Sequence, residues 1–143
     1  MKKSIIALLF LLGQLQGAED LFTVMKSNSW KSNSEKTIKW LEAHNEKLFN
    51  NKQFVSLFGK MVVKFHNGEA LMFHPDNSVP SRGKLEFIRQ IGDQVVFQAM
   101  DPYSGKEVAR VVEFDEDRNG YSVFVRMAPF GSEIEFREYF DKQ

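Results

Sequence analysis

Three histidines, His44, His66 and His74, are the side chains in this chain that could hold a transition metal. Such a site needs three ligands that converge on one point. His66 and His74 lie on either side of Asn67-Gly68, in a segment that predicts a two-residue hairpin. In that register the two rings point to opposite faces of the strand pair. We therefore expect no metal site built on histidine.

A second candidate cation site is the run Asp115-Glu-Asp117-Arg-Asn119-Gly120. It matches the first half of a calcium loop. The twelfth position of such a loop must supply a bidentate glutamate, and here that position is Arg126. The flanking segments also have the pattern of strands rather than helices. The run therefore favours an acidic hairpin turn, and we expect neither a metal nor another cofactor.

Nucleophilic catalysis has no support in this sequence. Cysteine is absent, and no serine stands in a Gly-x-Ser-x-Gly elbow. One carboxyl group is unusual, because Glu138 shares a predicted strand face with Ile134, Phe136 and Phe140. A carboxyl among apolar side chains is typical of an acid with a shifted pKa, or more often of a strand end that meets water. We expect a protein that is not an enzyme.

The two tryptophans are candidates for a ligand site or a partner surface. Trp40 lies off the apolar stripe of a predicted helix, so it lines a ligand mouth or packs the helix across a barrel end. Trp30 stands in a short polar segment, Ser27 to Ser32, that precedes this helix. The residues that we expect to line a ligand site are Trp30, Trp40, Phe65, Met72, His74 and Phe136.

The hairpin from Lys60 to His74 is the clearest structural element in the sequence. Asn67-Gly68 separates two alternating runs, which is the strongest short-range hairpin signal. A two-residue turn pairs Phe65 with Ala70 and Val63 with Met72. The face predicted to be core consists of Met61, Val63, Phe65, Ala70, Met72 and His74.

Further strands follow one another to the end of the chain. They are predicted over 84–91, 94–100, 107–114, 121–127 and 133–140. In the hairpin around Gly92-Asp93 neither face is purely apolar, so either a bulge breaks the pairing or both faces are partly covered. A meander of about eight strands, counting the Trp30 segment, leaves no unpaired edge if it closes. The fold class is therefore mainly β: an antiparallel up-and-down meander, closed as a barrel, with one N-terminal helix.

That helix is predicted from about 33 to 49. Ser32 and Glu35 have the spacing of a capping box. An apolar stripe follows on one face of the helix: Ile38, Leu41, Leu48 and Phe49. We expect this helix and the apolar turn at 54–58 to plug or lid one end of the barrel, with Trp40 at the rim.

A short Trp-containing segment, a helix and a strand meander resemble the lipocalin-like (calycin) small barrels of exported bacterial proteins. The Gly-x-Trp of that family stands here as Asn28-Ser29-Trp30. The resemblance implies an arginine near the end of the last strand that packs over the tryptophan. Arg137 is the candidate, and Arg126 competes with it. A barrel of eight strands holds side chains or one small ligand.

Residues 1–18 have the features of a signal peptide. Lys2 and Lys3 precede an apolar run, Ile5 to Leu12, and Gly17-Ala18 offers small residues for cleavage. The run is shorter than the roughly 20 residues that span a bilayer. We expect an exported protein, periplasmic or secreted, with residues 19–143 as a single lipocalin-like domain.

Charge and composition limit the kinds of partner that this chain is expected to bind. Without Lys2 and Lys3, 17 of the 19 basic side chains remain against 19 acidic ones. This balance argues against nucleic acid and against electrostatic attachment to anionic lipid. No cysteine is present to carry a lipoprotein anchor. We expect a monomer without a membrane anchor.

Two functions are consistent with this sequence. The first is a non-enzymatic barrel that binds a small apolar or amphipathic ligand. The alternative is a protein-interaction module, an inhibitor or envelope accessory protein, whose barrel is packed solid. A cavity of roughly 300 Å³ or more, lined by phenylalanine and methionine, favours the ligand.

Overall fold

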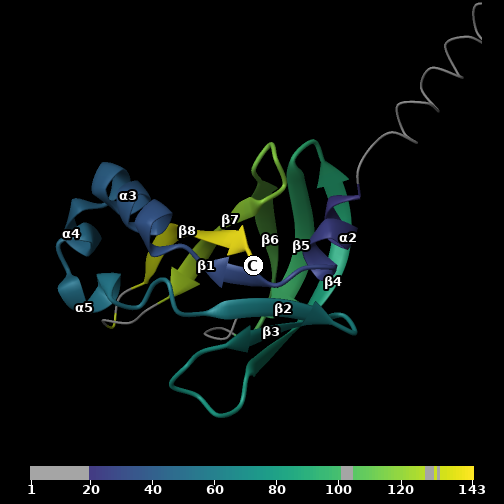
Figure 1. Ribbon diagram of the computed structural model, residues 1–143, viewed down its shortest axis with the longest axis horizontal. Coiled ribbons are helices and arrows are strands. Elements are labelled where there is room, and N and C mark those ends of the chain that lie inside the picture. The colour runs from purple at the N-terminus through teal and green to yellow at the C-terminus, as the bar shows by residue number, and fades with distance from the viewer. Residues whose placement is uncertain (1–19, 101–104, 128–130, 132) are drawn as a thin grey trace, which may run out of the picture.

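The computed structural model describes residues 20–100, 105–127, 131 and 133–143, and these residues form a closed barrel with short helices attached (Figure 1). The predicted signal peptide lies outside the described residues. Each of the eight strands in this part of the chain pairs antiparallel with its sequence neighbours, and β1 pairs with β8. The expected closed meander is therefore confirmed. The strands are β1 (Trp30–Ser32), β2 (Val62–His66), β3 (Glu69–Phe73), β4 (Ser81–Ile91), β5 (Gln94–Met100), β6 (Glu107–Phe114), β7 (Gly120–Met127) and β8 (Ile134–Lys142).

The hairpin of β2 and β3 has the predicted register, with Phe65 opposite Ala70. Asn67 and Gly68 have φ values of +50° and +73°, as a type I′ turn requires at both central positions. The predicted core face is also confirmed for the residues that pack against the barrel interior: Met61, Val63, Phe65, Ala70 and Met72.

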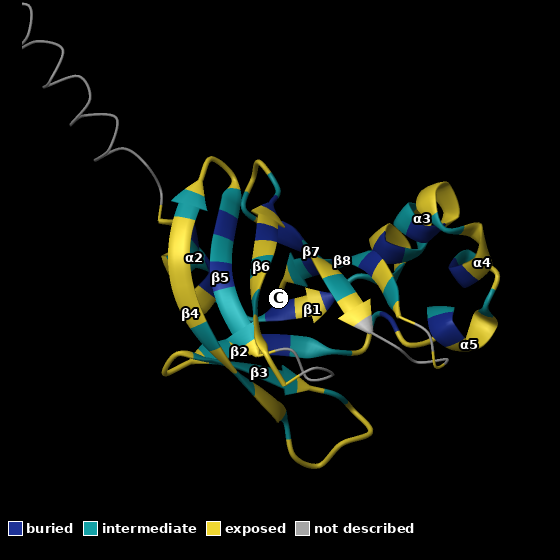
Figure 2. Ribbon diagram, turned by 180° about the vertical axis from the view of Figure 1, so that it is seen from behind, coloured by how far each residue is buried: buried dark blue, intermediate teal, exposed yellow. Residues whose placement is uncertain are grey.

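The hairpin of β4 and β5 contains the bulge that was one of two alternatives. The pairing shifts between Phe87 and Arg89. β4 pairs with β3 through Ser81–Lys84 and with β5 from Leu85 onward. Figure 2 shows β4 mostly exposed and β5 more deeply buried.

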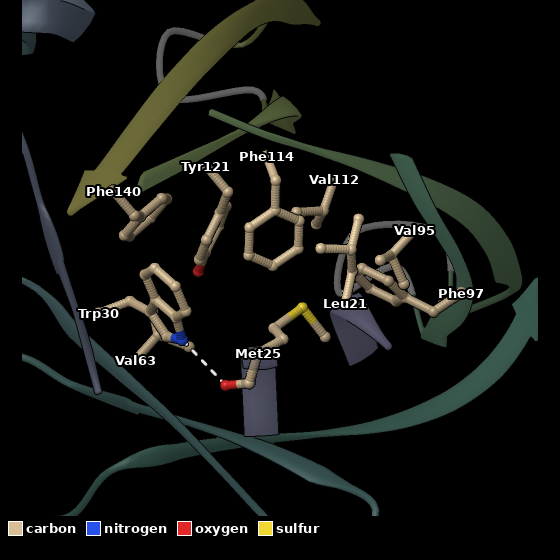
Figure 3. Packing of buried hydrophobic residues seen from close by; sticks show 10 residues of the cluster. All are labelled: Leu21, Met25, Trp30, Val63, Val95, Phe97, Val112, Phe114, Tyr121 and Phe140. Carbon is tan, nitrogen blue, oxygen red and sulfur yellow. Dashed lines mark hydrogen bonds between the residues drawn. The ribbon is translucent and has the colours of Figure 1, made fainter. Parts of the chain in front are cut away.

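A short helix that the sequence pattern does not predict closes one end of the barrel. This helix, α2 (Leu21–Lys26), projects Leu21 and Met25 into the interior, where both are fully buried (Figure 3). The Leu21 N–H donates to Gln90 Oε1 at 2.9 Å, and Phe22 stacks on Phe87 at 4.9 Å between ring centroids. These contacts place α2 at the end of the barrel where the 92–93 turn lies.

The main barrel core gathers around α2. Trp30 is fully buried, and its indole N–H donates to the Met25 carbonyl at 2.9 Å. The Trp30 ring meets Tyr121 edge-on at 4.9 Å between centroids. Figure 3 shows the other buried members converging on the same point: Val63, Val95, Phe97, Val112, Phe114 and Phe140.

The prediction of one continuous helix over 33–49 is wrong. The helix breaks at Asn45, giving α3 (Ser34–His44) and α4 (Glu46–Phe49), and α5 (Lys52–Val55) follows. Asn45 has φ −150° and ψ 82°, outside the helical region, and its side chain caps α4. Asparagine favours a cap over a helix interior because its side chain bonds nearby backbone.

The predicted capping box is also replaced. Asn33, not Ser32, caps α3, with Oδ1 accepting from the Lys36 N–H at 2.9 Å. The Ser32 hydroxyl is instead used inside the barrel wall, where it donates to Glu138. A tertiary hydrogen bond has thus taken the serine that the local pattern assigned to the helix.

The group formed by α3, α4 and α5 packs against β7 and β8 (Figure 1). Beyond the end of β1, α3 covers the edge of β8, because the Tyr139 N–H donates to Thr37 Oγ1 at 3.0 Å and the Asn33 N–H donates to the Tyr139 carbonyl at 2.8 Å. A second core cluster holds these helices to β8: Leu41, Leu48, Phe54, Phe58 and Phe136. The role of this group as a lid stays a prediction, whereas α2 fills one end of the barrel with Leu21 and Met25. Among the described residues, no helix has the length and apolar character needed to cross a membrane.

Candidate ligand cavity

An apolar cavity of about 310 Å³ lies inside the barrel. It reaches toward the end opposite α2, because residues near that end, such as Gly83 and Met100, form part of its wall. Its apolar lining comes from seven strands, β2 to β8, and from the residue before β2, and includes Met61, Phe65, Met72, Phe97, Val123 and Phe140. The expected phenylalanine and methionine set thus surrounds space rather than filling it.

Two polar groups, Glu138 and Tyr121, lie on this wall. Glu138 is 6% exposed, and burial raises the pKa of its carboxyl to about 7, while the hydrogen bond from Ser32 acts in the opposite direction. Burial, with a smaller contribution from the charge of Glu138, raises the pKa of Tyr121 above its usual range. Near neutral pH the cavity therefore offers a phenol and a carboxyl that exists in both protonation states.

Glu138 is held in place from β1. The Ser32 hydroxyl donates to Glu138 Oε2 at 3.0 Å and accepts from the Gly59 N–H at 3.0 Å. Gly59 has φ +88°, and a Cβ there would lie 3.1 Å from the Ser34 side chain. The loop that leads into β2 can approach Ser32 this closely because position 59 is glycine.

Basic side chains lie on the cavity wall as well. Lys84, Arg110 and Arg126 come from β4, β6 and β7. β6 and β7 pair through Val112–Phe114 and Tyr121–Val123, so the described residues show no pairing between the two strands at the level of Arg110 and Arg126. Arg126 lies on the cavity wall with about half of its side chain exposed, so the cavity borders solvent beside this arginine.

Two of the six predicted ligand-binding residues, Phe65 and Met72, line the cavity. The hairpin register places both on the inner face. Phe136 lies on the inner face too, but it is buried against Phe54 and Phe58 in the second cluster. Because Phe136 packs against these helices, it is not part of the cavity wall.

The other three predicted residues lie elsewhere. Trp30 is enclosed by the core around α2. Trp40 stacks on His44 at 4.4 Å and meets Phe124 edge-on at 6.1 Å between centroids. β3 ends at Phe73, and His74 bonds locally, with Nδ1 accepting from the Asp76 N–H at 3.3 Å. None of the three is part of the described cavity wall.

The arginine contact implied by the family resemblance is not formed. The Arg137 guanidinium lies 4.3 Å from the centre of the Phe124 ring and donates to Ser122 Oγ at 2.8 Å. Arg126 forms an ion pair with Glu133 at 2.9 Å. Trp30 is covered from inside by α2, so no arginine is needed to shield it.

Neither candidate cation site is assembled. Among the described residues, no group of three or more histidine, aspartate or glutamate side chains is placed to hold a metal ion. The acidic run forms the turn between β6 and β7, in which Asp117 Oδ1 accepts from the Asn119 N–H at 2.9 Å. Asp115 lies 3.6 Å from the Lys36 ammonium, and Arg118 donates to Asp93 at 2.8 Å.

A larger hollow, of about 560 Å³, is lined mainly by polar and charged side chains. Two of these, Arg82 and Glu69, form an ion pair at 3.2 Å. The cavity inside the barrel is the better candidate site, because small-molecule sites are mostly apolar with a few placed polar groups.

The sequence pattern marked Glu138 as unusual, but it did not predict Tyr121 and Arg110 as parts of the wall or Ser32 as the hydrogen-bond partner of Glu138. The alternation along 107–114 and 121–127 carries a signal for Tyr121 and Arg110, since Arg110 shares a face with Val112, and Tyr121 with Val123.

No protein-family model, curated protein or solved structure matches this chain. What the site can bind is therefore argued from its geometry alone.

Proposed function

We propose that this chain is an exported, non-enzymatic, lipocalin-like protein that binds a small apolar or amphipathic molecule inside its barrel. The observation that carries the proposal is the cavity of about 310 Å³, lined by methionine and phenylalanine and bounded by a closed antiparallel meander. Ligand sites of about this size bury a small molecule in apolar surroundings. Such a molecule would enter on the side of Arg126, which lies on the cavity wall and is half exposed.

The cavity also weighs against the alternative of a solid-packed interaction module. That alternative needs an interior filled by side chains at the density of a protein core. Here α2 and the residues around Trp30 fill one end of the barrel, and the other part stays hollow. An empty apolar space of this size is costly to stability, and a ligand that fills it removes the cost.

The test fills the cavity from within. Ala99 on β5 lines the cavity, and Ala99→Trp should displace a bound apolar molecule. The probe is N-phenyl-1-naphthylamine, an uncharged dye whose fluorescence rises in apolar surroundings. We expect saturable dye binding by the wild type and at least about tenfold weaker binding by Ala99→Trp.

The matched control is Val111→Trp, which adds the same ring at an exposed position on β6. It should leave dye binding unchanged. Equal dye binding by wild type and Ala99→Trp would contradict the proposal, because the dye would then lie outside the barrel. Mass spectrometry of molecules that co-purify with the protein would identify the natural ligand.

A further inference from the structure

Glu138 is a buried carboxyl that the barrel leaves without a charged partner. It comes from the inner face of β8, between Phe136 and Phe140, and it lies on the cavity wall. The Ser32 hydroxyl occupies Oε2. Within the described residues, Glu138 forms no ion pair, so a molecule in the cavity has access to a carboxyl that no protein cation neutralises.

The charged and titratable groups around the cavity do not change this conclusion. Tyr121, from β7, is a neutral phenol at physiological pH because burial raises its pKa. Arg126 is engaged by Glu133 at 2.9 Å and lies 4.0 Å from Glu135. Arg110 takes part in an interaction of its own, and Lys84 is exposed. The cations at the wall therefore leave the carboxyl to a ligand.

A buried carboxylate in apolar surroundings is unfavourable unless a cation meets it. An amide or a leucine at position 138 would avoid that cost if the position served only to pack the barrel. In a ligand site, the buried carboxylate of Glu138 can bind a cationic group of the ligand. An ammonium group bound there would donate to the free carboxylate oxygen, and a charged hydrogen bond is stronger than a neutral one in a low dielectric.

We propose that the cavity takes an amphipathic primary amine, with its ammonium group on Glu138 and its hydrocarbon part against the methionine and phenylalanine wall. This inference rests on the proposed ligand-binding function. It names the head group that the site selects. The amine stays protonated at neutral pH, since alkyl ammonium groups resemble lysine, whose pKa is about 10.

The experiment compares three ligands with one hydrocarbon chain and different head groups: octylamine, octanol and octanoate. Each displaces N-phenyl-1-naphthylamine from the wild-type protein at pH 8. We expect octylamine to bind at least about tenfold more tightly than octanol, the strength of one charge-assisted hydrogen bond. At pH 5.5 this preference should fall, because Glu138 is then mostly protonated and must lose its proton to hold an ammonium group.

The variant Glu138→Gln keeps the shape of the side chain and its acceptor for Ser32. It should lower octylamine affinity at least about tenfold at pH 8 and leave octanol affinity within about threefold. The matched control is Glu116→Gln, which removes the same charge from an exposed position in the turn between β6 and β7. It should leave all three affinities unchanged.

The outcomes separate this inference from the function on which it rests. If the dye binds inside the wild-type barrel but octylamine binds no more tightly than octanol, the amine proposal is overturned and the ligand site stands. Tightest binding of octanoate also overturns it, and would assign the head group to the cations of the wall. If neither the dye nor any octyl compound binds, the proposed function itself fails. The head-group comparison uses only the wild type, so it decides the matter even if Glu138→Gln does not fold.

Discussion

At the scale of single residues, Glu138 shows how burial changes the chemistry of a side chain. The same carboxyl type on the outer face of β8, at Glu135, is exposed to water. Glu138 lies three residues away, on the opposite face, and burial raises its pKa to about 7 from an ordinary value of 4.5. Alternation along one strand therefore decides which of the two carboxyls responds to neutral pH.

The first prediction is the pH dependence of stability. Because the folded-state pKa of Glu138 is raised, the folded protein binds more protons than the unfolded chain between pH 4.5 and 7, and its stability falls as pH rises through this range. Between pH 5 and pH 8 the wild type should lose about 2–3 kcal/mol relative to Glu138→Gln. Urea unfolding of both proteins at several pH values measures this difference. Glu135→Gln should follow the wild-type profile, and parallel profiles for wild type and Glu138→Gln would contradict the raised pKa.

The second prediction concerns the turn of the first hairpin. Gly68 has φ +73°, and its position is otherwise open, because a Cβ there would lie 4.0 Å from the nearest atom, the Leu85 carbonyl oxygen. Gly68→Val should cost about 1 kcal/mol or more, because a β-branched residue resists positive φ. Thermal unfolding measures the loss. Gly83→Val is the control, since Gly83 has no positive φ and nothing within 4 Å, and it should be tolerated.

At the scale of elements, the helices α2 and α3 pack in two different parts of the molecule. The helix α2 enters the barrel and builds the main core, whereas α3 covers the edge of β8 and joins the second core cluster. Both present fully buried side chains, Met25 from α2 and Leu41 from α3. Burial alone therefore does not say which helix controls the cavity.

The third prediction separates the two helices. Met25→Ala and Leu41→Ala should each cost about 2–5 kcal/mol, as expected for a large buried side chain cut to alanine. Only Met25→Ala should raise the affinity for N-phenyl-1-naphthylamine or the number of dye molecules bound. The reason is that Met25 belongs to the main core cluster, several of whose members also line the cavity. Chemical unfolding and dye titration measure the two effects. A larger gain in dye binding from Leu41→Ala would return the lid to α3.

At the scale of the whole molecule, the barrel divides its interior into a filled end and a hollow end. Trp30 and the side chains of α2 fill one end, with aromatic contacts from Phe114, Tyr121 and Phe140. The cavity occupies the remainder, toward the end opposite α2. A barrel of eight strands has just enough interior for this division.

The fourth prediction concerns export. We expect protein recovered from outside the cytoplasm to lack residues 1–18, which carry the pattern of a signal peptide. Intact-mass measurement of the purified protein decides the point. Protein that retains Met1 and stays in the cytoplasmic fraction would contradict it. The position of the cut is the least constrained part, because Gln16 stands where a small residue is usual.

The local sequence determined those features of the fold that depend on near neighbours. Asn67-Gly68 set the turn and the register of β2 with β3, and the uneven faces around Gly92-Asp93 allowed two alternatives, of which the bulge is the one the structure contains. The alternating runs gave the strand order, and closure followed from the cost of unpaired edges. Two of the predicted site residues, Phe65 and Met72, reached the cavity because that hairpin register fixed their face.

Tertiary structure decided the rest, because the competing contacts come from distant parts of the chain. Ser32 does not cap the helix, because its hydroxyl donates to the carboxyl of Glu138, 106 positions away in the sequence. The six residues of α2 are too few to show a helical stripe in the sequence. The helix is stable because Leu21 and Met25 are buried in the barrel interior. Phe136 and Trp30 lie outside the cavity wall because they pack in two core clusters whose members a local sequence pattern cannot predict. The sequence by itself determined where the chain turns and which face looks inward, and only the assembled barrel decided which inward side chains fill the core and which surround the cavity.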